Sequence, residues 1–194
     1  MKLTTLKEKI NTLKKYKEGL VISLIKHGSV CGKITDFVSI QDKTKLPSSY
    51  GKAKGKYPFF INNDEGVQKY CDEYCFNGTY LILNTGGSAS IKLYQGKFSA
   101  MSDCLVIKPK SNPIGIYFYL KYLENKINKV GFQGTCLKHL DQRWLLEQIA
   151  LIPKIEQGKL EKVNTYLDNK LQVLMDKEKA FKEIKNYLLS NLFI

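Results

Sequence analysis

The chain has 194 residues, 43% of them hydrophobic and 11% aromatic, which is enough to bury a core and to form one domain with an appendage. A formal net charge of +13 favours a polyanionic partner, because a field of that sign concentrates phosphate groups, although a lysine-rich coding background explains part of it. No stretch approaches the roughly 18 apolar residues of a membrane span, and the N-terminus lacks the apolar run of a signal peptide, so we expect a cytoplasmic protein without a membrane partner.

Residues 1–26 are predicted to form an N-terminal helix. Apolar side chains recur there every three or four residues, from Leu3 to Leu24, which places them on one face of a helix. Gly28 then ends the helical pattern.

Residues 27–153 are predicted to form a strand-rich domain. Short apolar runs such as KYPFFINND and GTYLILNT are separated by glycine, proline and asparagine, and one helical segment, IYFYLKYLENKI, interrupts them. Together with the helices on either side, this pattern predicts an α+β fold.

The paired glycines Gly86 and Gly87 allow two interpretations, a phosphate-binding loop or the turn of a β-hairpin. A phosphate-binding loop requires a lysine and a serine or threonine after the glycines, with a helix directly behind them. The sequence that follows alternates like strands instead, with a second turn expected at Gln95–Gly96 and an apolar run over 104–107. A hairpin turn is therefore the better interpretation.

Residues 154–194 are predicted to form a long C-terminal helix, because their apolar stripe is free of proline and of internal glycine. A helix over about 156–192 would be on the order of 55 Å long at 1.5 Å per residue. Such a helix is too long to be buried against its own domain and needs a partner, in an antiparallel coiled coil or helix pair. The stripe consists of Leu160, Val163, Leu167, Leu171, Leu174, Phe181, Ile184, Leu188 and Leu192.

The two helical ends of the chain resemble each other. A shift of 168 residues places Leu3 on Leu171 and Leu20 on Leu188. Two interpretations remain open: any two helices rich in lysine and leucine match in this way, or the N-terminal helix is the tail of a preceding copy in an alternation of helix and domain.

The sequence offers little for catalysis or metal binding. Cys71 and Cys75 have a CxxxC spacing, but the two histidines of the chain do not supply an obvious second pair of zinc ligands. Cys136 and His139 lack an orienting third group and oxyanion donors. We expect no cofactor, no metal and no catalytic activity in this chain.

Several segments resemble the DNA-specificity (S) subunits of type I restriction-modification systems. HGSVCGKITDFVSIQDKTKLPSSY is similar to the family's entry segment, and KYPFF is similar to its YPF strand. YLILNTGGSASIKLYQGKFSAMSDCLVIKP resembles the family's glycine-containing hairpin, and IYFYLKYLENKI resembles the helix after it. GTCLKHLDQRWLLEQIALIPKIEQGKLEKVNTYLDNKL resembles the family's exit segment. It departs from the family pattern at Lys154, where a second proline is usual, and at Gly158.

The resemblance implies a non-catalytic subunit that reads double-stranded DNA and lends its specificity to methylation subunits and to restriction subunits. Family members typically hold two target recognition domains joined by two long antiparallel helices, and each domain reads one half of a bipartite site. This chain resembles a half-length form, with a single recognition domain at 27–153 and helices at 1–26 and 154–194 for dimerisation and partner docking. We therefore expect a homodimer on an inverted-repeat site with a fixed spacer.

Three segments of the middle domain hold the residues that we expect to contact DNA: a lysine-rich loop at 42–58, the glycine turn at 85–92 and a loop at 131–141. Lysines without fixed geometry make phosphate contacts, whereas shorter polar groups and closely approaching glycines suit base edges. A solvated loop and a hairpin corner remote from DNA are the alternatives for the first two segments. Arg143, the only arginine, suits a phosphate or guanine contact or a salt bridge to Asp141 or Glu147. The predicted DNA contacts are Lys43, Lys45, Ser48, Ser49, Tyr50, Lys52, Lys54, Lys56, Thr85, Gly86, Gly87, Ser88, Ser90, Lys92, Thr135, Lys138, His139 and Arg143.

A second class of function stays open beside DNA recognition. In it the protein is a non-catalytic interaction or assembly adaptor, and its basic charge is compositional. The two functions differ in their response to salt. A protein that recognises DNA should prefer one sequence and should lose DNA binding steeply as salt is added, whereas an adaptor should do neither.

Overall fold

The computed structural model describes residues 3–26, 29–63, 67, 69–136, 138–153 and 157–192, without the side chains of 21, 24–26, 153, 157–161, 164 and 192. The chain divides into a helical unit, Met1–Lys26 with Ile155–Ile194, and a globular unit, His27–Lys154. Helices and strand-rich sheets are both present, which confirms the predicted α+β class. Among the described residues, no helix combines the length and the apolar character that crossing a membrane requires.

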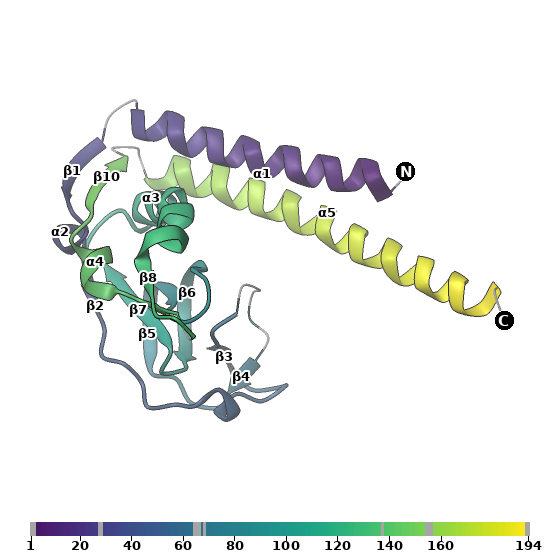
Figure 1. Cartoon of the computed structure of the whole chain (residues 1–194), viewed down its shortest axis with the longest axis horizontal. Coiled ribbons are helices and arrows are strands. Elements are labelled where there is room, and N and C mark those ends of the chain that lie inside the picture. The colour runs from purple at the N-terminus through teal and green to yellow at the C-terminus, as the bar shows by residue number, and fades with distance from the viewer. Residues whose placement is uncertain are drawn as a thin grey trace. The chain divides into compact units, whose positions relative to one another are not determined.

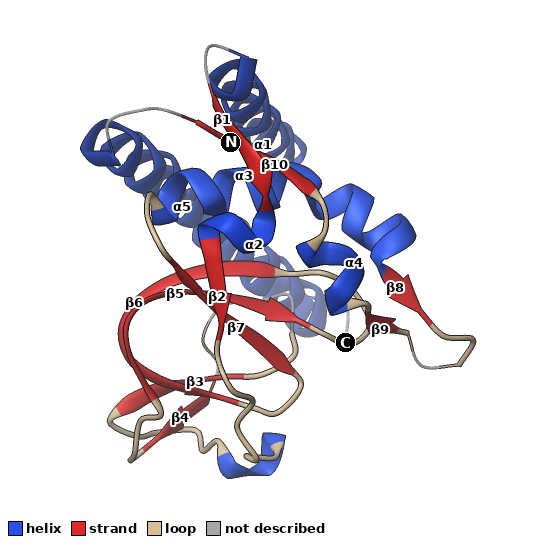
Figure 2. Ribbon diagram, turned by 90° about the vertical axis from the view of Figure 1, so that its left-hand side faces the viewer, coloured by secondary structure: helices blue, strands red, loops and turns tan. Residues whose placement is uncertain are grey.

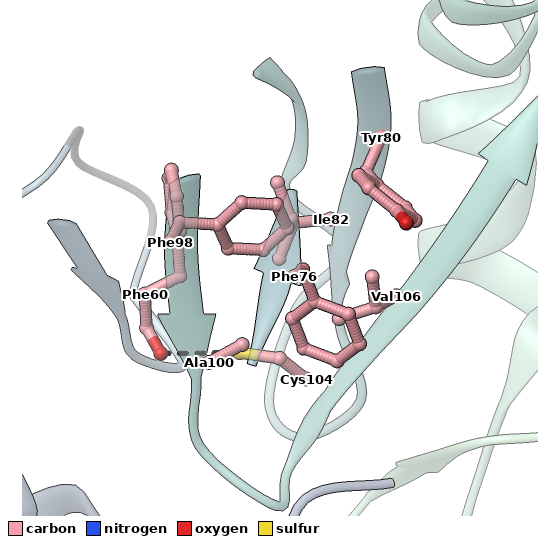
Figure 3. Packing of buried hydrophobic residues seen from close by; sticks show 8 residues of the cluster. All are labelled: Phe60, Phe76, Tyr80, Ile82, Phe98, Ala100, Cys104 and Val106. Atoms are coloured by element: carbon pink, nitrogen blue, oxygen red, sulfur yellow. Dashed lines mark hydrogen bonds between the residues drawn. The ribbon is translucent and has the colours of Figure 1, made fainter. Parts of the chain in front are cut away.

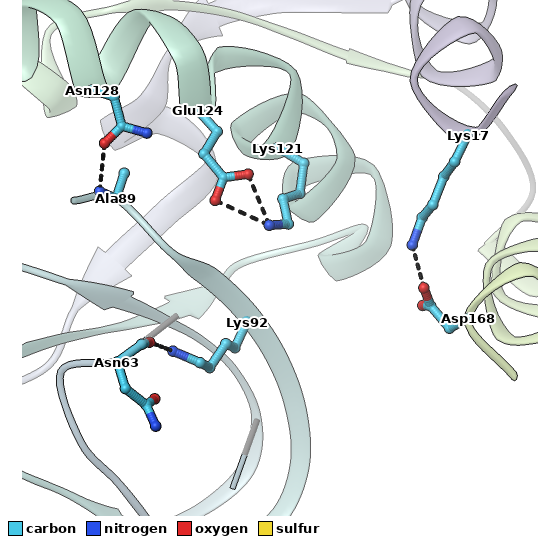
Figure 4. A network of polar contacts seen from close by, with 8 residues as sticks. All are labelled: Lys17, Asn63, Ala89, Lys92, Lys121, Glu124, Asn128 and Asp168. Atoms are coloured by element: carbon cyan, nitrogen blue, oxygen red, sulfur yellow. Dashed lines mark hydrogen bonds and ion pairs between the residues drawn. The ribbon is translucent and has the colours of Figure 1, made fainter. Parts of the chain in front are cut away.

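The helical unit consists of two helices, α1 (Leu3–Lys26) and α5 (Gln157–Leu192), which lie antiparallel in Figure 1. Lys17 of α1 forms an ion pair with Asp168 of α5, with 2.5 Å between Nζ and Oδ1 (Figure 4). The predicted long C-terminal helix is present, and Gly158 lies inside its first turn without breaking it.

Helix α5 is longer than its partner in this unit. Its 36 residues span about 54 Å, whereas the 24 residues of α1 span about 36 Å. An antiparallel register through Lys17 and Asp168 aligns Leu3 with about position 182. The last ten or so residues of α5 therefore extend beyond the end of α1.

The globular unit is built on a six-stranded sheet with the order β2-β7-β5-β6-β3-β4. Figure 2 shows that the longer strands curve, so that the sheet curls around its inner face. Its strands are β2 (Val38–Ile40), β3 (Tyr57–Phe60), β4 (Lys69–Cys71), β5 (Phe76–Asn84), β6 (Ile91–Ala100) and β7 (Cys104–Pro109).

Shorter elements complete the globular unit. Two antiparallel ribbons pair β1 (Ser29–Lys33) with β10 (Ile149–Pro153) and β8 (Phe132–Gln133) with β9 (His139–Leu140). The remaining elements are α2 (Ile34–Phe37), a 3₁₀ turn at Ser48–Tyr50, α3 (Pro113–Lys126), a π turn at Ile127–Gly131 and α4 (Gln142–Leu146).

The expected β-hairpin at the paired glycines is confirmed. Strands β5 and β6 pair antiparallel up to Leu83 and Ile91, and the loop between them carries Gly86 and Gly87. The second turn expected at Gln95–Gly96 is wrong, because β6 continues through it to Ala100. Gly96 lies opposite Gly78 in the ladder, and both have positive φ, which lets the strands pass through this point without turning.

A cluster of apolar side chains fills the inside of the curled sheet. Figure 3 shows Phe98 at its centre with Phe60, Phe76 and Tyr80 around it. The rings of Phe60 and Phe98 meet edge to face, with 5.4 Å between centroids and 89° between planes, the favoured geometry of an aromatic pair. Cys104 lies in the same cluster, and its Sγ lies 3.8 Å from the carbonyl oxygen of Phe60 (Figure 3).

Helix α3 begins at a well-defined cap and packs against strands β6 and β10. Asn112 accepts a hydrogen bond from Gly115 N at 2.9 Å, and Pro113 follows it in the first turn, where a missing N–H costs nothing. Tyr119 donates a hydrogen bond from its hydroxyl to the carbonyl oxygen of Ile149, which ties the helix to the start of β10. The helix therefore anchors the ribbon by which the chain enters and leaves the globular unit.

Candidate nucleic-acid interface

Four segments that are far apart in the sequence line one pocket of the globular unit. They follow β3, join β5 to β6, join β6 to β7 and join β8 to β9. The pocket measures about 490 Å³, and we call it the loop-end pocket. It is lined by Asn62, Gly86, Gly87, Asp103, Thr135, Cys136, Lys138 and His139.

Backbone hydrogen bonds hold these loops together. Gly87 N donates to Lys138 O at 3.2 Å, and Leu140 N donates to Thr85 O at 2.9 Å, so the glycine loop pairs with the edge of β9. Thr85 N donates in turn to Asp103 O at 3.1 Å. Main-chain contacts of this kind fix the loops regardless of their side chains, which leaves those side chains available for contacts with a ligand.

Asn62 braces the floor of the pocket. Its Nδ2 donates to Gly86 O at 3.0 Å, while its Oδ1 is buried and has no hydrogen-bond partner among the described residues. The neighbouring Asn63 offers its carbonyl oxygen to Asn84 Nδ2 and to Lys92 Nζ (Figure 4). Because the Asn62 oxygen is closed to solvent, a ligand donor can reach it only if the amide moves.

The predicted DNA contacts in the lysine-rich loop fall into two groups. Lys43, Lys45, Lys54 and Lys56 are exposed. Lys52 forms an ion pair with Asp72 at 3.1 Å, and that hydrogen bond raises the pKa of Lys52 and lowers the pKa of Asp72.

The three-residue turn in this loop is tied to the sheet. Ser48 and Ser49 are exposed, and the carbonyl oxygen of Ser48 accepts a hydrogen bond from Lys69 Nζ at 2.7 Å. The ring of Tyr50 packs on Phe59 with 5.7 Å between centroids. The turn is therefore held in place, while Ser48 and Ser49 are exposed on it.

The predicted contacts around the glycine turn are divided between the interior and the surface. Gly86 and Gly87 line the loop-end pocket, as expected for close approach. Thr85 and Ser90 are buried, and Thr85 Oγ1 donates to Asp103 O at 2.7 Å. The hydroxyl of Thr85 therefore serves the fold in this conformation.

The other two polar residues of this segment are half-buried. Lys92 donates from Nζ to Asn63 O at 2.6 Å, and so points toward the segment after β3 rather than into solvent (Figure 4). Ser88 lies in the turn itself and also has an interaction partner. A contact from either residue to an external ligand requires these internal contacts to be exchanged.

The third predicted segment contributes directly to the pocket. Thr135, Lys138 and His139 are exposed and line it. Arg143 is exposed on α4, outside the pocket lining, and Asp141 is engaged elsewhere, since it caps α4 by accepting from Trp144 N at 3.0 Å.

Three pocket residues, Cys136, Asn62 and Asp103, were not among the predicted DNA contacts. Cys136 lies in the third predicted segment, whereas Asn62 and Asp103 lie outside all three. Each stands alone in its loop, without a motif or a periodic pattern to mark it. The pairing of β3 with β6 and of β7 with β5 brings them beside the glycine turn. Among the described residues, no group of three or more histidine, cysteine or acidic side chains is arranged to hold a metal ion.

The predicted stripe of α5 is most buried in its middle, at Leu167, and is exposed on both sides of it. Leu167 is buried and Leu171 and Leu174 are half-buried, whereas Val163 and the stripe residues Phe181, Ile184 and Leu188 are exposed. The side chains of Leu160 and Leu192 lie outside the described residues. A groove of about 730 Å³ runs between α1 and α5 and is lined by residues that include Leu13 and Leu174.

The known proteins that this chain resembles in sequence or in structure are described as specificity subunits. Residues 28–180 match the family model of the type I restriction modification DNA specificity domain. Two Mycoplasma pneumoniae proteins assigned as type I specificity subunits are similar in sequence. The first is 28% identical over 167 residues, which cover 81% of this chain and 46% of the relative. The second is 33% identical over 92 residues, which cover 47% of this chain and 37% of the relative. The chain thus spans less than half the length of these relatives.

Solved structures show the same fold. The S subunit of a type I restriction-modification system from M. genitalium superposes with a TM-score of 0.71 and 16% identity, covering 96% of this chain and 55% of that chain. The HsdS subunit from Thermoanaerobacter tengcongensis superposes with a TM-score of 0.55 and 14% identity, covering 96% of this chain and 53% of the other. With the family model matching most of its length, this chain belongs to the type I restriction modification DNA specificity family.

Proposed function

We propose that this chain is the DNA-recognition subunit of a type I restriction-modification complex in the cytoplasm, and that it has no catalytic role of its own. The observation that carries the proposal is the loop-end pocket, where polar side chains and main-chain groups from four separate loops converge. Such convergence suits the reading of base edges, which needs short donors and acceptors on a rigid support. Membership of the specificity family supports the same function.

Lysines beside the pocket supply the phosphate contacts in this proposal. Ser102 N, next to Asp103, donates to Leu46 O at 3.0 Å, so the segment that carries Lys43 and Lys45 runs beside the pocket loop. Both lysines are exposed. Flexible ammonium groups hold the DNA backbone without reading sequence, and so complement a pocket that reads bases.

The helical unit assembles the complex in this proposal. The exposed part of the α5 stripe offers an apolar surface for a second copy of the chain and for the methylation subunits, to which restriction subunits are added. A symmetric dimer presents two recognition domains about a two-fold axis. Its DNA site is then an inverted repeat with a fixed spacer.

The salt dependence of DNA binding tests the proposal. For wild-type protein the logarithm of the binding constant should fall linearly with the logarithm of salt concentration. Lys43→Ala with Lys45→Ala should make this slope shallower by about two, because two phosphate contacts are lost, and should weaken binding to all sequences alike. Fluorescence anisotropy on a labelled duplex at several salt concentrations measures both quantities.

A matched control separates a site from general charge. Lys177→Ala with Lys179→Ala removes the same charge from exposed positions of α5 and should leave the slope unchanged. Equal effects of the two double variants would assign the binding to net charge alone. Absence of any sequence preference and of salt-dependent binding would assign the chain to the second class, an assembly adaptor.

A further inference from the structure

Asp103 is an unusual residue for the place it occupies. It lines the loop-end pocket beside Lys138 in a chain of net charge +13, on a surface proposed to meet a polyanion. A carboxylate at such a surface repels phosphate, so it favours DNA binding only if it accepts a hydrogen bond there.

The main-chain carbonyl of Asp103 accepts hydrogen bonds that hold the loop, whereas its side chain is available to contact a ligand. Its carbonyl oxygen accepts from both the amide and the hydroxyl of Thr85, at 3.1 and 2.7 Å. Its carboxylate is exposed, and among the described residues it takes only a long hydrogen bond of 3.5 Å from Ser102 and no ion pair. The side chain can therefore be changed without removing the contacts that hold the loop.

A second acceptor belongs to the same pocket. Asn62 Oδ1 has no partner among the described residues, while Nδ2 of the same amide is fixed on Gly86 O at 3.0 Å. The hydrogen bond from Nδ2 orients the amide, so the oxygen and not the nitrogen is the unused atom. That oxygen is closed to solvent in this conformation, so the exposed Asp103 carboxylate is the acceptor in this pocket that a ligand donor can reach.

We infer that Asp103 is a specificity-determining residue that accepts a hydrogen bond from the exocyclic amino group of cytosine or adenine in the major groove. In the major groove the amino groups of these two bases are the donors, and aspartate is a natural acceptor for them. The inference rests on the proposed function and names the base chemistry that this pocket reads.

The glycine turn leaves room for a base edge. A Cβ atom on Gly86 would lie 2.9 Å from Asn62 Nδ2, so any side chain there would displace the amide that braces the pocket. Gly87 has φ of 76°, a left-handed conformation, and a Cβ atom built on it would point into open space. The wall of the pocket is thus bare backbone, over which a base pair can approach closely.

The test compares two variants that each remove one negative charge. Asp103→Asn keeps the shape of the side chain but adds a donor, and Asp42→Asn changes an exposed acid in the lysine-rich loop. Wild-type chain, assembled with its methylation subunits, selects bound duplexes from a random DNA library, and sequencing gives the preferred bases at each position. Wild-type and Asp42→Asn protein should enrich one motif that contains a cytosine or an adenine at the position read by Asp103.

Asp103→Asn, which keeps an acceptor oxygen but loses the charge and gains a donor, should change the preference at that single position by about five-fold or more, the range of one base contact, and should leave the other positions unchanged. The identity of the relaxed base tells cytosine from adenine. A second variant, Asp103→Ala, should relax the same position, and thermal unfolding of both should match wild type. A motif that is unchanged in both variants overturns this inference alone, whereas the absence of any motif for wild-type protein overturns the proposed function as well.

Discussion

Cys104 shows at the scale of one residue how the curled sheet affects chemistry. Its thiol lies in the apolar cluster, and burial raises its pKa from 9.0 to about 11. At neutral pH it is therefore a protonated, unreactive side chain that acts as a small apolar group in the core. The exposed Cys31 and Cys136 have no such shielding.

The raised pKa of Cys104 predicts a loss of stability in alkali. The folded state holds the thiol proton more tightly than the unfolded state, so the contribution is complete below pH 9 and falls as pH rises towards 11. Over that range wild-type protein should lose up to about 2 kcal/mol more unfolding free energy than Cys104→Ala, whose pH profile lacks this group. Urea unfolding at several pH values measures the difference. The exposed-thiol variant Cys31→Ala should follow wild type, and a Cys104→Ala profile parallel to wild type would contradict the prediction.

Side-chain placement explains which contacts could be predicted from the sequence. Residue type marked Lys138 and His139 as candidates, and the structure puts both in the pocket. It also marked Thr85, whose hydroxyl is used inside the fold, because threonine suits either role. Asn62 and Asp103 could not be found, since their position beside the glycine turn depends on strand pairing across distant parts of the chain.

At the scale of elements, the hairpin of β5 and β6 depends on a pair of facing glycines. Gly78 has φ of 138° and Gly96 has φ of 137°, and they are opposite each other in the ladder. An L-residue with a Cβ atom rarely adopts this conformation, so these two positions let the ladder cross the bend of the curled sheet.

Alanine at these glycines should therefore have an opposite effect to alanine in a helix. Gly96→Ala is expected to destabilise the protein by roughly 1–3 kcal/mol through backbone strain. Gly19→Ala lies within α1, where a Cβ atom would meet no neighbour, and should be neutral or stabilise by up to about 1 kcal/mol. Thermal unfolding midpoints check both signs, and a neutral Gly96→Ala would show that the positive φ is not required.

Elements with local signals were predictable, whereas their pairing was not. The two terminal helices and the helical insert follow from periodicity within their own segments, and the paired glycines mark the turn of the hairpin. The parallel pairing of β3 with β6, at Phe59 with Ser99, and the ribbon that joins Ser29 to Pro153 connect distant positions. No local pattern encodes such pairs, because either strand has apolar residues that would suit several neighbours.

At the scale of the whole molecule, the far end of α5 has no partner among the described residues of its own helical unit. Ile184 is 56% exposed and Tyr187 is 68% exposed, and Leu188 and Leu189 are also exposed. These residues lie beyond the reach of α1, which ends in register at about position 182. Exposed apolar side chains in such a row favour association, because burying them removes apolar area from water.

The proposed dimer predicts that the mass in solution depends on this end of α5. Light scattering after size exclusion should give wild-type protein near twice 22.2 kDa at low and at high salt, because apolar contacts are not screened. Ile184→Asp should raise the dissociation constant by about ten-fold or more, since a buried charge is left unpaired at the contact. Asn186→Asp adds the same charge outside the stripe and should leave the dimer intact. A wild-type monomer at both salt concentrations would contradict self-pairing, and equal dissociation by the two variants would trace the effect to charge rather than to the apolar stripe.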